Sequence, residues 1–177
     1  NNLFMLDNFN DIISFMQSIS EKATYVKNIV IDDSTYIMRK EYFKTAKQTG
    51  YNKFIDMASH FQSIISTAEN MRDNINVFLI MHSEDIVSDN VIVGYKPSTV
   101  GKLIDNSYNP IEVVPMLLYS AVKYDENKNP IYGFYTHRCL DGNIEIPAKS
   151  PAEMFDKDFI PNDLGLVVKA MDEYYNG

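Results

Sequence analysis

Two adjacent carboxylates, Asp32 and Asp33, end a strongly apolar stretch and are the residues best placed for chemistry. They follow Asn28-Ile29-Val30-Ile31, a pattern typical of a strand that is buried on both faces. Such a strand delivers its last side chains to the carboxyl edge of an α/β sheet, where a carboxylate can hold Mg²⁺ through bound water. Asp32 is therefore predicted as a metal ligand. The alternative is that an acid stands there only because a strand end is wet and Asp caps the next helix.

A second apolar stretch, Ile75–Met81, also ends in polar groups, His82 and Glu84 among them. A lone His at a strand end is structural more often than functional. Two buried strands with polar ends, separated by a long helical segment, favour a shared site. We predict that Tyr25–Ile31 and Ile75–Met81 are adjacent parallel strands, which would bring Asp32 and His82 together at one sheet edge.

Hydrophobic periodicity gives the elements that must position these residues. The predicted helices are Asn8–Ser20, capped by Asp7 or Asn8, Thr35–Gln48, ended by Gly50, Asn52–Met71 and Asn162–Tyr175. The predicted strands are Leu3–Leu6, Tyr25–Ile31, Ile75–Met81, Val113–Tyr124 and Ile131–Arg138, the last two forming an antiparallel hairpin. Residues 85–102 are predicted as a loop. Buried strands that alternate with helices indicate an α/β sheet with an antiparallel extension.

Composition and charge limit the classes of function. The 177 residues are 45% apolar and 23% charged, which predicts one globular domain over 1–177. No apolar run approaches the roughly 20 residues of a membrane span, and the single cysteine, Cys139, excludes an internal disulfide, so a soluble cytoplasmic protein is predicted. The net charge of -8 opposes nucleic-acid binding by the whole surface but leaves room for a local basic groove.

Several short motifs occur in an order that resembles a known family. They are Ile29-Val30-Ile31-Asp32-Asp33, Tyr51-Asn52-Lys53-Phe54, Met81-His82-Ser83-Glu84, Ile92-Val93-Gly94, Val100-Gly101-Lys102 and Ala148-Lys149-Ser150-Pro151. From about Tyr25 to Phe155 the chain resembles phage-encoded ATP-binding proteins of the RecA-like AAA group, which are associated with single-strand annealing and recombination. The resemblance implies a RecA-like P-loop NTPase core, with a mostly parallel sheet flanked by helices and a C-terminal antiparallel hairpin, and it implies ATP and Mg²⁺ as cofactors.

The resemblance also implies roles for the residues at the two strand ends. Asp32 matches the acid of a Walker B strand and would hold Mg²⁺. Asp33 or Glu84 would orient or deprotonate the attacking water. His82 would contact the γ-phosphate as the sensor of the following strand.

Three further assignments concern partners. Lys149 or Arg138 would complete the nucleotide site of a neighbouring subunit in a homo-oligomer, although Lys149 can equally be a solvated loop lysine. The 84–101 loop would contact single-stranded DNA through Tyr95 and Lys96, although nearby acids oppose DNA there.

The chain departs from the family in its phosphate-binding loop. No Gly-x-x-x-x-Gly-Lys-Ser/Thr motif occurs in the 177 residues, and the chain does not begin with Met. We expect that the N-terminal segment, with its Walker A motif, has been cut away or that the chain is degenerate, and that the chain as given does not hydrolyse ATP at a useful rate. Two functions follow: an ATPase of phage DNA recombination or replication that acts on single-stranded DNA in the host cytoplasm, or a non-catalytic RecA-like module for assembly or partner binding in a phage complex or particle.

Overall fold

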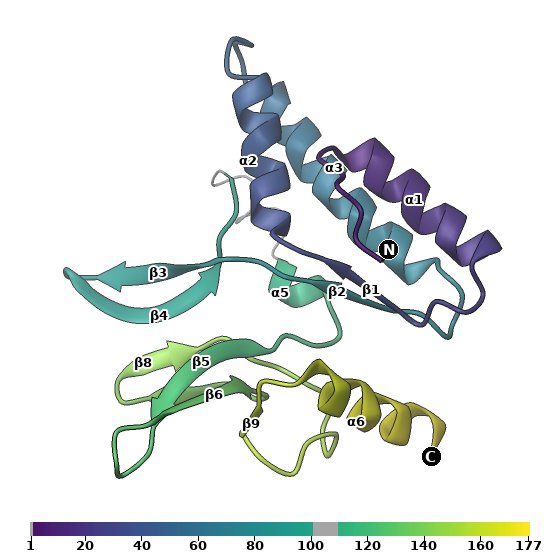
Figure 1. The fold of residues 1–177 in the computed structure, drawn as a ribbon. Coiled ribbons are helices and arrows are strands. Elements are labelled where there is room, and N and C mark those ends of the chain that lie inside the picture. Colours follow the sequence, from purple (N-terminus) through teal and green to yellow (C-terminus); the bar gives the residue numbers. More distant parts are fainter. Residues whose placement is uncertain (1, 101–109) are drawn as a thin grey trace. The chain divides into compact units, whose positions relative to one another are not determined.

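A computed structural model describes residues 2–100 and 110–177 of the chain (Figure 1). The chain divides into two compact units. The first comprises Asn1–His82 and Pro97–Pro110, and the second comprises Ser83–Lys96 and Ile111–Gly177. Each unit is described by itself.

The first unit packs three helices against a two-stranded sheet (Figure 1). Its elements are α1 (Phe9–Lys22), β1 (Asn28–Ile31), α2 (Ser34–Lys44), α3 (Asn52–Glu69) and β2 (Asn76–Leu79). The side chain of Asn8 caps α1 by accepting a hydrogen bond from the backbone N–H of Asp11, as the sequence predicted.

The strands β1 and β2 are adjacent and parallel, which confirms the prediction for these two stretches. Asn28 lies opposite Asn76, and Ile31 lies opposite Leu79. The backbone ladder continues past β2, because the N–H of Ile80 donates to the carbonyl of Ile31 at 3.0 Å. The residues that follow the two strands therefore meet at one edge.

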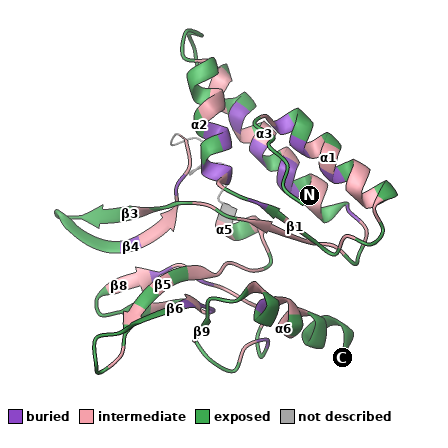
Figure 2. Ribbon diagram, viewed as in Figure 1, coloured by how far each residue is buried: buried purple, intermediate pink, exposed green. Residues whose placement is uncertain are grey.

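The core of the first unit lies between its helices. Figure 2 shows the buried positions of α1, α2 and α3. The largest side chains that are less than 2% exposed here are Met16 of α1, Met38 of α2, and Met57, Phe61 and Ile64 of α3. The Met and Phe stripe of α3 is thus core packing, as its helical spacing predicted.

Two local predictions in the first unit are wrong. α2 ends at Lys44, because the hydroxyl of Thr45 turns back to the carbonyl of Glu41 at 3.0 Å, so Gly50 is not its cap. Leu3–Leu6 is not a strand, since no neighbouring strand is present in the described chain for it to pair with.

The second unit is built from two small sheets and two helices. The first sheet has the order β3-β4-β8-β7, with β3 (Ser83–Ser88), β4 (Val91–Pro97), β7 (Cys139–Asp141) and β8 (Ile144–Ile146). The second has the order β5-β6-β9, with β5 (Tyr119–Tyr124), β6 (Pro130–Tyr135) and β9 (Phe159–Pro161). The helices are the short α5 (Pro110–Val113) and α6 (Leu164–Asn176). The predicted antiparallel hairpin is confirmed as β5 and β6. Its first strand begins at Tyr119 and not at Val113, which is the last residue of α5.

A hairpin, β3–β4, occupies most of the segment that was predicted as a loop. Asp89 and Asn90 connect the strands with φ of 51° and 62°. A two-residue turn with both φ values positive is the connection that matches the twist of paired strands, and Asp and Asn tolerate it well. The loop prediction was wrong because Gly94 and Pro97 were read as breakers, whereas both lie within β4.

The core of the second unit is small. Tyr135, Ile146 and Ala148 are buried at its centre, and Tyr119 and Phe159 are among the partly buried side chains packed against them. Burial, together with a 2.6 Å hydrogen bond from the Tyr135 hydroxyl to Asp141, raises the pKa of Tyr135 far above its usual value.

The predicted RecA-like core, a mostly parallel sheet flanked by helices, is therefore wrong. Ile31 is the only buried residue of β1, and β2 has none, so these are not the strands buried on both faces that their apolar pattern indicated. Parallel pairing joins β1 to β2 and, at a single residue pair, β4 to β8, and most of the other pairings in the described chain are antiparallel, in several small sheets. The prediction extended two apolar strands to a whole sheet. The remaining apolar stretches alternate with turns and form hairpins instead.

Candidate functional site

The carboxyl ends of β1 and β2 bring Asp33 and His82 together. Asp33 Oδ1 lies 3.3 Å from His82 Nε2, an ion pair when the imidazole is protonated. Asp33 sits at the N-terminus of α2 with φ of 52°, but its side chain makes no capping hydrogen bond. Its carboxylate therefore faces the histidine rather than the helix. The partner of His82 is therefore Asp33 and not Asp32, which was predicted to lie beside it. Asp32, the predicted Mg²⁺ ligand, follows β1 as an exposed residue.

A buried hydroxyl ties this edge to residue 98. Thr35 Oγ1 donates to the carbonyl of Ser98 at 3.2 Å and accepts the backbone N–H of His82 at 3.1 Å. The N–H of Ser98 in turn donates to the carbonyl of His82 at 2.7 Å. These hydrogen bonds thus connect Thr35 at the start of α2, His82 beyond the end of β2, and Ser98.

The other predicted site residues lie in the second unit. Glu84 pairs with Lys96 at 2.9 Å, and Arg138 pairs with Glu145 at 2.7 Å. Lys149 Nζ lies 3.4 Å from the carbonyl oxygen of Glu112. Asp33 and His82 belong to the first unit. The role of Glu84 toward the attacking water and those of Arg138 and Lys149 toward a neighbouring subunit stay predictions.

The edge of β1 and β2 is a poor fit to a bound nucleotide. The N–H of Ser34, at the start of α2, donates to the carbonyl of Ile80 at 2.9 Å, and the Ser34 hydroxyl donates to the carbonyl of Ile31. These donors are consequently not directed at a phosphate. No group of three His, Cys, Asp or Glu side chains in the described ranges could hold a metal ion. ATP and Mg²⁺ stay predictions from the resemblance.

A different surface of the first unit gathers positive charge. Residues 34–54 contain five cations, Arg39, Lys40, Lys44, Lys47 and Lys53, and a single carboxylate, which gives a net charge of +4 in a chain whose net charge is -8. Three acids, Asp32, Asp33 and Asp56, flank this stretch, so the excess of cations belongs to residues 34–54 themselves. Clustered cations of this kind are a common feature of polyanion-binding surfaces.

Aromatic rings are interleaved with these cations. An open groove of about 660 Å³ is lined by Tyr36, Arg39, Tyr42, Phe43, Phe54, Thr99 and Val100. Tyr36 is 54% exposed and Phe43 is 74% exposed, so these rings are presented outward rather than packed in the core. We call residues Tyr36, Arg39, Tyr42, Phe43, Lys44, Lys47, Lys53 and Phe54 the basic-aromatic surface.

Helical geometry places the components of this surface side by side. Tyr36, Arg39 and Phe43 are spaced by three and four residues, so they share one face of α2. The Arg39 guanidinium donates to Ser98 Oγ at 3.3 Å, which uses one of its five N–H donors and steadies the side chain. Lys53 Nζ lies 5.2 Å from the ring centroid of Phe54, within cation–π range.

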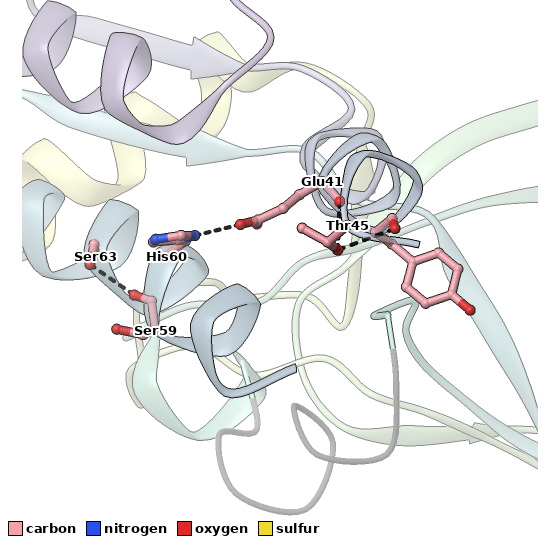
Figure 3. A network of polar contacts seen from close by, with 6 residues as sticks. Glu41, Thr45, Ser59, His60 and Ser63 are labelled. Carbon is pink, nitrogen blue, oxygen red and sulfur yellow. Dashed lines mark hydrogen bonds and ion pairs between the residues drawn. The ribbon is translucent and has the colours of Figure 1, made fainter. Parts of the chain in front are cut away.

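The single carboxylate of residues 34–54 is turned away from solvent. Glu41 Oε1 lies 2.6 Å from Nδ1 of His60, and only 17% of the Glu41 side chain is exposed. Figure 3 shows Glu41 reaching from α2 toward His60 on α3. This carboxylate therefore links α2 to α3 and is not itself presented on the exposed face of α2.

One cation next to the basic-aromatic surface is already paired. Lys40 Nζ lies 2.8 Å from Asp7 Oδ2. The hydrogen bond and charge of Lys40 lower the pKa of Asp7, and the same hydrogen bond raises the pKa of Lys40. Asp7 thereby reduces the positive potential at one end of α2.

The basic-aromatic surface was not predicted, although the sequence contains its signal. Five cations and five aromatic residues fall within 34–54, but the net charge of -8 argued against nucleic-acid binding by the whole surface, and this stretch was not considered. The predicted DNA contact at Tyr95 and Lys96 finds less support. The ring of Tyr95 stacks on that of Tyr119 with centroids 5.3 Å apart, and Lys96 pairs with Glu84.

Comparison with protein-family models, with curated proteins and with solved structures finds no match. Within the described residues, no helix is both long enough and apolar enough to cross a membrane.

Proposed function

We propose that this chain binds single-stranded DNA through the basic-aromatic surface of α2 and α3. The observation that supports the proposal most strongly is the coincidence of a net charge of +4 over residues 34–54 with exposed rings on α2, within the same stretch. Cations that follow a phosphate backbone and rings that stack on bases are the two components of single-strand recognition.

The exposed rings favour a single strand over a duplex. Tyr36 and Phe43 can stack only on bases whose faces are accessible, and the bases of a duplex are stacked on one another. Arg39, between them on the helix face, can pair with a phosphate and can also stack its planar guanidinium on a base. A groove with this composition binds with little sequence preference, because every base has a π-face.

The proposal is tested by fluorescence anisotropy with a labelled oligothymidylate of about 20 nucleotides, titrated at several salt concentrations. For a single strand, each lost phosphate contact reduces the slope of log K against log[salt] by about 0.7. Arg39→Ala and Lys44→Ala are expected to reduce this slope. Phe43→Ala should instead keep the slope and weaken binding by about fivefold to 100-fold, since stacking contributes about 1–3 kcal/mol per base.

Matched controls come from α6 in the second unit. Lys169 is an exposed cation, and Tyr175 is an exposed ring, 58% accessible. Lys169→Ala and Tyr175→Ala are expected to leave both the affinity and the salt slope unchanged. Equal losses in the α2 and α6 variants, or equal affinity for a duplex of the same length, would refute the assignment.

A further inference from the structure

Three side chains of the second unit, Ser150, His137 and Asp158, are aligned in the order of a nucleophile, a base and an orienting acid. Ser150 Oγ lies 3.1 Å from Nε2 of His137, and Nδ1 of the same imidazole lies 3.4 Å from Oδ1 of Asp158. His137 lies in the β6–β7 connection, Ser150 follows β8, and Asp158 directly precedes β9. This is the arrangement by which a serine hydroxyl is activated.

A hydrogen-bond chain fixes the proton on the imidazole. Thr136 Oγ1 donates its only proton to the carbonyl of Lys157 at 2.7 Å, so it can only accept from Nδ1 of His137, which lies 2.9 Å away. Nδ1 therefore carries the proton of the neutral ring. The lone pair of Nε2 is consequently directed at Ser150 Oγ. The single hydroxyl proton of Ser150 has two acceptors within reach, Nε2 at 3.1 Å and the carbonyl oxygen of Thr136 at 3.0 Å, and general-base catalysis uses the hydroxyl rotamer that points to Nε2.

The backbone around the three residues is held in place. Lys149 and Leu117 exchange two backbone hydrogen bonds of 2.8 and 2.9 Å directly before Ser150, and Pro151 directly after it has a fixed φ. The N–H of Thr136 donates to the carbonyl of Asp158 at 2.9 Å, and Thr136 is fully buried. The serine and the imidazole are thus presented on anchored segments.

We propose that Ser150 is a nucleophile that hydrolyses small, activated carboxylic esters, with His137 as its general base and Asp158 as a positioning residue. This activity is independent of the DNA-binding proposal, since all its residues lie in the second unit. One third of the His137 side chain is exposed, so a small acyl group can reach the pair from solvent.

The reaction proceeds in two balanced steps. Ser150 Oγ forms a bond to the ester carbonyl carbon while its proton passes to His137 Nε2. The C–O bond to the leaving alkoxide then breaks, and the imidazole protonates that oxygen to give the alcohol. In the second step His137 takes a proton from water, the resulting hydroxide attacks the acyl carbon, the bond to Oγ breaks, and the proton returns to the serine. The products are one alcohol and one carboxylic acid.

The test uses a fluorophosphonate, with which an activated serine forms an Oγ–P bond and releases fluoride. Mass spectrometry of the full chain after digestion is expected to locate the adduct on Ser150. His137→Gln should slow labelling by about 100-fold, as loss of a general base does. His60→Gln, a histidine of the first unit, should leave the labelling rate unchanged. An adduct on other residues only, or equal rates in wild type and His137→Gln, would overturn the proposal.

Two further readouts separate catalysis from a structural role. Ser150→Ala should abolish the p-nitrophenyl acetate turnover of the wild-type chain while circular dichroism shows an unchanged melting curve, and turnover that persists in Ser150→Ala overturns the proposal. Asp158→Asn should slow labelling by only about threefold to tenfold, because this carboxylate is 77% exposed and water screens its charge. Asp158→Glu should restore part of that loss, and no recovery would remove Asp158 from the assignment.

Discussion

Gly133 of β6 is the position where a single methyl group should damage the second unit most. A Cβ at this position would lie 2.5 Å from the backbone oxygen of Ile160 and 2.5 Å from Cε1 of the Phe159 ring, whereas ordinary contacts begin at 3.4 Å. The ring can rotate, but a strand carbonyl can move only with its strand. Gly133→Ala should therefore push β9 away from β6 by about 0.9 Å.

The expected cost follows from the contacts that this movement weakens. β6 and β9 are paired over only three residues, Gly133 to Tyr135 against Phe159 to Pro161. Weakening two backbone hydrogen bonds at about 1 kcal/mol each, together with the contact between the rings of Tyr135 and Phe159, predicts a loss of about 2–4 kcal/mol. With a urea m-value of about 1–3 kcal/mol/M, the unfolding midpoint should fall by about 1–2 M.

The assay is urea unfolding followed by far-UV circular dichroism, since the chain has no Trp. Gly165→Ala is the control: the added Cβ lies on the exposed start of α6 and meets the carboxylate of Asp163 at 3.0 Å, which caps α6 by accepting the N–H of Gly165 at 2.7 Å. A weakened cap and the higher helix propensity of Ala, each about 1 kcal/mol, oppose one another, so a change within about 1 kcal/mol is expected. In the double variant Gly133→Ala/Phe159→Leu, recovery should be partial, because the Ile160 oxygen remains. A wild-type midpoint for Gly133→Ala, or full recovery in the double variant, would refute the reasoning.

Two further predictions concern titration and charge. Burial and the hydrogen bond to Asp141 raise the pKa of Tyr135 above its unfolded value, so the free energy of unfolding should decline as pH rises above about 10. Tyr135→Phe should flatten this decline, which urea unfolding between about pH 8 and about pH 11 measures. Identical pH profiles for the wild type and the variant would contradict the prediction. Asp7→Asn should release Lys40 and tighten binding to the oligothymidylate by about twofold to fivefold at low salt, an effect that Asp172→Asn on α6 should not reproduce.

The parts of the fold that the sequence predicted best are those with strong local patterns. The stripe of Met57 and Phe61 gave α3, and Asn8 gave the cap of α1. β1 and β2 are short apolar runs whose long helical connection is sufficient for a parallel crossover, so their adjacency could be foreseen. The contact of His82 was predicted with Asp32, whereas the structure forms it with Asp33.

The wider sheet could not be foreseen, because the number of strands in a sheet depends on pairings that no local pattern records. Exposed apolar residues of β3 and β4, such as Val87 and Val91, alternate too weakly to indicate strands, and the turn at Asp89 and Asn90 is the only clear signal. The resemblance added a mostly parallel sheet to the strands that periodicity indicated, and the described chain does not form that sheet.

The candidate sites differ in how far sequence could reveal them. The charge of residues 34–54 is visible in the sequence, but the turning of Glu41 toward His60 is a tertiary contact that no sequence pattern indicates. Ser150 and His137 are 13 positions apart, with no motif between them, and only the folded second unit aligns them. Spatial proximity across hairpins is what single-sequence reasoning lacks.

Photo-crosslinking locates the bound DNA directly on the chain. An oligothymidylate of about 20 nucleotides with iodouracil at defined positions is irradiated in complex with the wild-type chain, and the adducts are mapped by mass spectrometry. Binding by the basic-aromatic surface predicts adducts within residues 34–54, on Tyr36, Tyr42 or Phe43, whose rings are the exposed stacking groups of α2. Adducts confined to the β3–β4 hairpin or to α6, or no adduct under conditions where anisotropy reports binding, would contradict the assignment of this surface to single-stranded DNA.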